Sequence, residues 1–275
     1  ALFFGIPVTF NQHLDLTAIT SSTTSNNKKM FRAAVIALAL GSASAFQAVR
    51  APAGRTATKV QESKADLQSL AQKLNPAVKF FDPLGLSGQS FWGKDESATI
   101  GFLRQSEIKH GRIAMFAFCG FIAGSNGVTF PWAIDLEGTP FPSADGVPGA
   151  QWDSLSMSAK VQILSFITLM EIWDEGVGTH YMKGGKPGDF PSFKDSGVEL
   201  PHPVPFDLFD PFGLSKKASD EKKAAGLVKE INNGRLAMIG IFGFMAESKV
   251  EGAVPLISGM IKHYDGDYMA PFEFM

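Results

Sequence analysis

One pattern of charged and apolar residues occurs twice in the chain, at residues 107–124 and 230–247. Each copy has a glutamate, a His or an Asn three residues later and an arginine two residues further, and then continues as an apolar run. Charged side chains within an apolar helix are costly unless they are paired or bound to a ligand. The pattern therefore predicts two related helices whose charges need partners or ligands.

The repeat extends into a turn motif upstream of each copy. Asp82 begins an Asp-Pro-x-Gly sequence before the first copy, and Asp210 begins the same sequence before the second. Proline fixes φ and glycine permits a positive φ, so both sequences predict tight turns. The two copies indicate a duplicated unit with pseudo-two-fold symmetry between two long helices.

We predict an all-α fold with three long helices, at about residues 98–124, 156–175 and 219–249, and a shorter amphipathic helix at 255–263. The first helix would be roughly 40 Å long, enough to cross a bilayer at a tilt. The strictly uncharged run within each helix is short, and such runs are also typical of buried core helices. Hydropathy alone therefore leaves both a membrane protein and a helical core open.

The composition favours a membrane or a large apolar ligand, because charged residues make up only 19% of the chain, which contains 24 Phe and 28 Gly. The net charge of -2 argues against a nucleic-acid binder. Two long linkers, residues 127–153 and 176–211, are rich in Gly, Pro and aromatic residues. They are either disordered or organised by a bulky non-protein partner, and their aromatic content favours the partner. The single cysteine, Cys119, excludes an internal disulfide and is expected to be buried.

The first part of the chain has the composition of a targeting leader. Residues 30–45 have the basic start, short apolar core and small residues of a signal peptide, and residues 46–75 have the composition of an organelle transit segment. Residues 1–29 are interpreted as sequence upstream of the initiator, with a longer genuine leader as the alternative, and residues 76–275 as the functional domain. The alternative is that the apolar core of the signal is a helix of the folded protein.

Each arginine of the repeat lies five positions after the glutamate of its own copy, too far round the helix for an easy ion pair. If the helices cross at the glycine before each arginine, Glu107 can reach Arg235 and their backbones can approach closely. In the same way Glu230 can reach Arg112. Because arginine can hold one carboxylate oxygen, the other oxygen is expected to stay free for a ligand.

A magnesium ion in a planar ring would suit these free groups. Four ring nitrogens leave the metal an axial position for an oxygen or nitrogen donor, and Glu, His and Asn can each fill it. Glu107 and His110 share one helix face because they are three residues apart. Glu230 and Asn233 repeat this spacing, so each helix is expected to hold two large rings side by side.

Weaker candidates lie elsewhere in the chain. Gln162 and Glu171 belong to the middle helix, but Glu171 could equally be part of a solvated helix end and Gln162 a packed polar residue. Glu247 and His263 have similar structural alternatives, because a lone polar residue near a helix end is often only solvated or hydrogen-bonded.

Motifs of the common enzyme classes are absent from the sequence. Glu107 and Glu230 could in principle form an acid–base couple, but their arginines would hold both ionised. We therefore expect no enzyme.

The two copies, Glu-x-x-His-Gly-Arg-x-Ala-Met and Glu-x-x-Asn-Gly-Arg-Leu-Ala-Met, resemble the signature helices of the chlorophyll a/b- and a/c-binding light-harvesting family, in the same order. The Asp-Pro-x-Gly turns also match, and the resemblance covers about residues 78–265. It implies an all-α membrane protein with three transmembrane helices, the first and third crossed, and a short C-terminal amphipathic helix.

The resemblance also implies roles for single residues. It implies these axial chlorophyll ligands: Glu107, His110, Glu230, Asn233, Glu171, Gln162, Glu247 and His263. Arg112 and Arg235 are implied as crossed ion-pair partners, and Asp82 and Asp210 as residues near the carotenoid ends. Glu247 departs from the family pattern, since many members have glutamine there and this chain has no matching arginine.

A light-harvesting antenna is the function that the resemblance implies. The short middle helix and the leader resemble the a/c branch, which implies chlorophyll a, chlorophyll c and carotenoids of the fucoxanthin, peridinin or diadinoxanthin type. The expected location is the plastid thylakoid membrane, with a photosystem I or II core, neighbouring antenna subunits and thylakoid lipids as partners. A photoprotective relative that dissipates excitation and a pigment-free membrane protein are the alternatives.

Overall fold

The computed structural model describes residues 62–198, 200, 204–213 and 218–270, which are helical or irregular and contain no strand. All of these residues belong to one compact unit of the chain, residues 51–275. The predicted signal peptide and the residues before it lie outside the described part of the chain.

Three long helices form close to the predicted positions: α3 (Glu96–Ser125), α5 (Met157–Gly176) and α6 (Asp220–Lys249). Ser156 caps α5 by accepting from the Ala159 N–H, and Ser219 caps α6 by accepting from the Lys222 N–H. These caps satisfy backbone donors that a helix start leaves unpaired. The shorter helices are α2 (Lys64–Leu74), α4 (Pro148–Asp153) and 3₁₀ turns at 86–88, 91–93, 144–146, 181–183 and 255–257.

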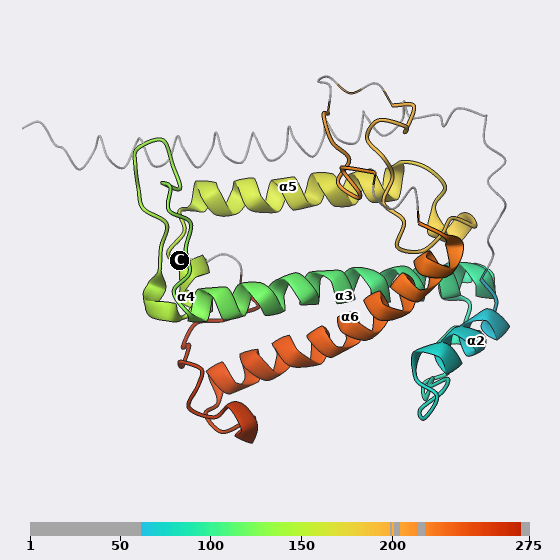
Figure 1. Ribbon diagram of the computed structural model, residues 1–275, viewed down its shortest axis with the longest axis horizontal. Coiled ribbons are helices and arrows are strands. Elements are labelled where there is room, and N and C mark those ends of the chain that lie inside the picture. Colours follow the sequence, from blue (N-terminus) through green and yellow to red (C-terminus); the bar gives the residue numbers. More distant parts are fainter. Residues whose placement is uncertain (1–61, 199, 201–203, 214–217, 271–275) are drawn as a thin grey trace, which may run out of the picture. The chain divides into compact units, whose positions relative to one another are not determined.

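Helices α3 and α6 lie side by side and cross at a pair of glycines (Figure 1). A Cβ atom on Gly111 would lie 3.1 Å from the Gly234 Cα, and one on Gly234 would lie 2.9 Å from the Gly111 Cα. Only glycine permits this backbone approach. Further along, the Phe118 and Phe244 rings stack at 4.9 Å between centroids, so the two copies of the repeat share one interface.

Helix α2 lies within the segment predicted as a transit sequence. Its start is fixed by a reciprocal capping box between Ser63 and Asp66. Its end is joined to α6, because the Asn232 side chain donates to the Leu74 carbonyl at 3.2 Å. The described part of this segment therefore packs on the long helices, while the boundary of the leader remains a prediction.

Two sequence predictions were wrong. The C-terminal amphipathic helix expected at 255–263 is only a 3₁₀ turn, Pro255–Ile257. Gly259, with φ of 75°, breaks helical geometry soon after it. Cys119 is exposed on α3 rather than buried.

By hydropathy, none of the helices in the described ranges has the length and apolar character required to span a membrane.

Candidate functional site

The glutamates and arginines of the repeat form two crossed ion pairs at the α3–α6 crossing. Arg112 donates from Nε to Glu230 Oε1 at 2.7 Å. Arg235 donates from Nε to Glu107 Oε1 at 2.8 Å, with Nη2 at 2.7 Å from the same oxygen. Each glutamate is therefore neutralised by the arginine of the other copy, and all four side chains are only partly exposed.

A third arginine changes one of these pairs. Arg104, which is buried, donates from Nη1 to Glu107 Oε2 at 2.8 Å. The expectation of a free oxygen on Glu107 was therefore wrong in this structure, because an arginine three residues earlier shares the face of α3. Leu227 holds the corresponding position before Glu230. Among the described residues, no hydrogen bond to the second oxygen of Glu230 is observed.

The metal-capable residues that follow the glutamates are both exposed. His110 Nδ1 lies 2.7 Å from the Ser106 carbonyl oxygen. A carbonyl can only accept, so Nδ1 carries the proton and Nε2 presents a lone pair away from the helix. The Asn233 side chain is exposed and makes no hydrogen bond within the described ranges. Both side chains can thus bind a neutral metal-centred ring.

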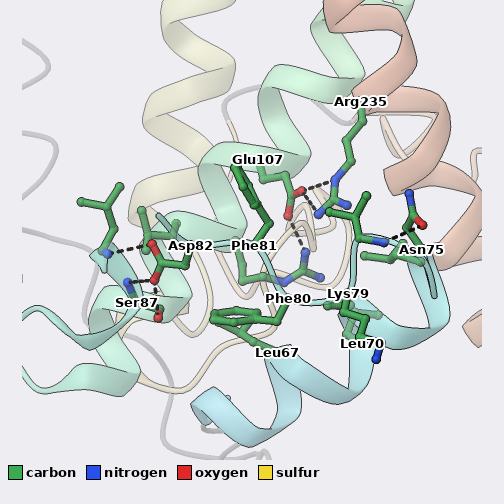
Figure 2. A pocket seen from close by; sticks show the side chains of 16 residues that line it. Leu67, Leu70, Asn75, Lys79, Phe80, Phe81, Asp82, Ser87, Glu107 and Arg235 are labelled. Carbon is green, nitrogen blue, oxygen red and sulfur yellow. Dashed lines mark hydrogen bonds and ion pairs between the residues drawn. The ribbon is translucent and has the colours of Figure 1, made fainter. Parts of the chain in front are cut away.

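A pocket of about 550 Å³ adjoins the Glu107 pair (Figure 2). Apolar residues of α2 and the following segment form one wall, and Figure 2 places Glu107 and Arg235 together beside Leu67, Leu70 and Phe80. Nine of the sixteen residues that line the pocket are apolar and seven are polar or charged, so its lining is amphipathic. The lining residues are Leu67, Leu70, Ala71, Leu74, Asn75, Val78, Lys79, Phe80, Phe81, Asp82, Leu86, Ser87, Leu103, Arg104, Glu107 and Arg235.

Asp82 lines this pocket and is bound within its own turn. It accepts from the Ser87 hydroxyl at 2.6 Å, the Ser87 N–H at 2.9 Å and the Leu86 N–H at 2.9 Å. These hydrogen bonds, that of the Ser87 hydroxyl first, lower the pKa of Asp82. The Asp210 turn repeats the backbone hydrogen bond, since the Gly213 N–H donates to the Asp210 carbonyl as the Gly85 N–H does to the Asp82 carbonyl. The backbone geometry differs, because Asp210 has a positive φ of 51° and Asp82 does not.

The end of α5 is joined to α3 through a lysine. Lys109 Nζ lies 2.6 Å from Glu171 Oε2 and 2.6 Å from Asp174 Oδ2. Gln105 also donates to Asp174, at 2.9 Å. The Glu171 side chain is 57% exposed, so the pair with Lys109 leaves it accessible. Gln162, also on α5, is exposed.

The remaining two candidates have other contacts. Glu247 is buried and accepts from the Gly252 N–H at 2.9 Å and from the Val254 N–H at 2.8 Å, one on each oxygen. Its carboxylate therefore holds the turn after α6. His263 is exposed, with Nε2 at 2.7 Å from Asp265 Oδ1.

Sequence reasoning missed three residues that shape the site: Arg104, Lys109 and Asn232. Arg104 could have been found, because a cation three residues before a glutamate shares its helix face. Lys109 and Asn232 are equivalent positions of the repeat, yet they contact different helices, α5 and α2. The repeat gave no signal for these contacts, since their partners lie outside it.

The crossed helices, their reciprocal ion pairs and the exposed imidazole and amide define a helical scaffold for metal-centred ring pigments. The chain belongs to the chlorophyll a-b binding protein family, whose model matches residues 63–249. Members of this family are pigment-binding light-harvesting proteins rather than enzymes.

Curated relatives support the family assignment. A fucoxanthin-chlorophyll a-c binding protein of Trieres chinensis is 30% identical over 236 residues, which cover 82% of this chain and 98% of the relative. Fucoxanthin-chlorophyll a-c binding protein F of Phaeodactylum tricornutum is 34% identical over 221 residues, or 79% of this chain and 95% of the relative. Light-harvesting complex stress-related protein 1 of Chlamydomonas reinhardtii is 33% identical over 177 residues, or 64% of this chain and 62% of the relative.

Proposed function

We propose that this chain is a light-harvesting antenna protein that binds chlorophylls and carotenoids and passes excitation energy to a photosystem. The observation that carries the proposal is the pair of charge-compensated glutamates, each followed on its helix by an exposed imidazole or amide. The names of the relatives support chlorophyll a, chlorophyll c and fucoxanthin as pigments. The relatives are chloroplastic, which supports a plastid location, and we place the protein in the thylakoid membrane.

The principal chlorophyll ligands in this proposal are His110, Asn233, Glu230 and Glu107. When bound, the chlorophylls and carotenoids absorb light and carry the excited state, and the protein fixes their distances and orientations. His110 offers Nε2 because the Ser106 carbonyl holds the opposite nitrogen. Glu230 offers its second oxygen while Arg112 neutralises its charge.

Other residues complete the proposed set of pigment ligands. Glu171 keeps one oxygen outside its pair with Lys109, and Gln162 is exposed on the same helix. His263 could bind only through its Nδ1, since Asp265 holds Nε2. For Glu247 we propose a structural role, because backbone N–H groups occupy both of its oxygens. We also place carotenoid ends near the turns of Asp82 and Asp210.

We further propose that α3, α5 and α6 lie across the thylakoid membrane. The observation in favour is a set of large apolar side chains exposed on these helices. Some occupy equivalent positions of the repeat, as Phe116 and Ile239 do, with 78% and 72% of their surface exposed. Covering these faces with lipid and pigment would be favourable, because it removes apolar surface from water. The charged side chains at the crossing of α3 and α6 are ion-paired, which reduces their cost in a membrane.

Refolding with pigments tests the antenna proposal. The chain, mixed in detergent with chlorophyll a, chlorophyll c and fucoxanthin, should yield a pigmented monomer. Its chlorophyll fluorescence should be excited by light that the carotenoid absorbs, since bound pigments transfer excitation. Absence of pigment uptake would overturn the proposal and favour a pigment-free membrane protein.

A photoprotective role is the second candidate, favoured by the match to stress-related light-harvesting relatives. The same ligands would serve a protein that dissipates excitation. The fluorescence lifetime of the pigmented protein separates the two roles. A lifetime that shortens on acidification supports dissipation, whereas a long lifetime at neutral and acidic pH supports the antenna.

A further inference from the structure

Helix α3 contains a buried arginine whose hydrogen bonding is incomplete. The Arg104 side chain is 6% exposed, and its Nε lies 3.4 Å from Oε2 of Glu62. Neither of these two buried atoms has a hydrogen-bond partner within the described ranges. An unpaired buried donor that faces an unpaired buried acceptor is unfavourable. A small movement of Arg104 toward Glu62 would satisfy both atoms.

Arg104 also lines the pocket next to Glu107. Glu62 directly precedes Ser63, which caps α2, so its pair with Arg104 joins the start of α2 to α3. The other end of α2 is joined to α6 by the bond from Asn232. Helix α2 is thus anchored at both ends beside the pocket. One of the two anchors is Arg104, which also donates to Glu107.

The charges around the pocket allow Arg104 to move without leaving an ion unpaired. Glu62 and Glu107 are balanced by Arg104 and Arg235. If Arg104 bonds fully to Glu62, Arg235 still neutralises Glu107 through Oε1. The movement would therefore release Glu107 Oε2 while each carboxylate keeps one arginine.

We propose that Arg104 is a positioning residue that admits a chlorophyll to Glu107 by moving from Glu107 to Glu62. This rests on the proposed function, in which Glu107 binds the magnesium of a chlorophyll. Arg104 and the magnesium compete for Glu107 Oε2, so the ligand binds only when Arg104 bonds to Glu62. Filling the site thereby tightens the anchor of α2 beside it.

The competing arginine is present in only one copy of the repeat. The position equivalent to Arg104 in α6 is Leu227, three residues before Glu230. Glu230 has only Arg112 as an arginine partner among the described residues. The Glu230 site is therefore filled without a competing cation, and the two copies differ in how they take up pigment.

The test counts chlorophylls per chain after refolding with chlorophyll a and carotenoid. Glu62→Gln removes the charge that receives Arg104, so it should lose about one chlorophyll. Arg104→Met removes the competitor and fills the space of the arginine stem, so it should keep that chlorophyll. The double variant Glu62→Gln/Arg104→Met should also keep it. If Glu62 and Arg104 formed only a structural pair, Arg104→Met would be at least as harmful as Glu62→Gln, and the double variant would not recover.

A matched pair in the second copy gives an independent measurement if Arg104→Met does not fold. Leu227→Arg introduces the competing cation beside Glu230 and should cost about one chlorophyll, whereas Leu227→Met should cost none. A full chlorophyll count in Glu62→Gln or in Leu227→Arg would overturn the role of Arg104.

Glu107→Leu separates this inference from the proposed function. Loss of one chlorophyll in Glu107→Leu, with none lost in Glu62→Gln, would overturn the role of Arg104 alone. A full count in Glu107→Leu would overturn Glu107 as a ligand and, with it, the role of Arg104.

Discussion

Arg112 and Glu230 are 118 residues apart in the chain, and their side chains bond at 2.7 Å across the crossing of α3 and α6. The reciprocal pair, Arg235 and Glu107, joins the same two helices at 2.8 Å. Because each charge is satisfied by the other helix, neither copy of the repeat is complete alone. The same four side chains therefore join the two helices and lie at the proposed ligand sites.

The two arginines should differ in their contribution to stability. Arg112→Leu leaves Glu230 without an arginine, whereas Arg235→Leu leaves Glu107 still bonded to Arg104. For these partly exposed groups we expect Arg112→Leu to lower the free energy of unfolding by about 2 kcal/mol and Arg235→Leu by roughly half of that. Unfolding in detergent, followed by circular dichroism, measures both. Equal losses in the free energy of unfolding would show that Arg104 does not compensate the charge of Glu107 when Arg235 is removed.

His110 should be replaceable by the residue of the other copy. His110→Leu removes the only donor at this position and should lose about one chlorophyll. His110→Asn supplies the amide that α6 carries at Asn233, so it should retain that chlorophyll. Pigment extraction from refolded protein gives both counts. A full count in His110→Leu would exclude His110 as a ligand.

Glu247 should affect stability rather than pigment content. Glu247→Ala removes the acceptor for the Gly252 and Val254 N–H groups, so the turn after α6 should loosen. We expect the Tm to fall by on the order of 5 °C, with the chlorophyll count unchanged. Glu247→Gln, which keeps one acceptor oxygen, is the control and should lose less. A missing chlorophyll at an unchanged Tm would instead identify Glu247 as a ligand.

Acidification should weaken the first Asp-Pro-x-Gly turn. Hydrogen bonds from Ser87 and Leu86 lower the pKa of Asp82 below its value in the unfolded chain. The stability that Asp82 contributes is therefore fully present above the unfolded value of about 3.9 and is lost as pH falls through the folded value. Between pH 6 and pH 3, roughly, the Tm of the wild type should fall more than that of Asp82→Asn. Parallel pH curves for the two proteins would contradict this.

The repeat carried enough information to predict the helix pair and its crossing. A glycine before each arginine marks the point where the backbones meet, and Gly111 and Gly234 lie in contact there. The starts of α5 and α6 were also predictable, because Ser156 and Ser219 are strong capping residues. These features depend on residues that are close together in the sequence, so they can be predicted without knowing the path of the chain.

Contacts that depend on long loops could not be predicted. The pairing of Lys109 with Glu171 requires the path of the chain from α3 to α5, which no local pattern specifies. Glu247 was predicted as a ligand from its position in the family pattern. Its hydrogen bonds to the Gly252 and Val254 N–H groups could not be predicted, because every residue except proline carries a backbone N–H. The composition of helix α2 is compatible with a transit segment and with a helix of the folded domain, and we predicted the first. The hydrogen bond from Asn232 to the Leu74 carbonyl shows that α2 packs on α6.

The most direct measurement is the chlorophyll count of the double variant Arg112→Leu/Glu230→Leu. Removing both charges leaves no unpaired ion, so the helices should still associate with a Tm near that of the wild type. The account predicts that this protein folds with pigment and carries one chlorophyll fewer than the wild type. A folded double variant with the full number of chlorophylls would contradict the claim that the compensated glutamates bind pigment.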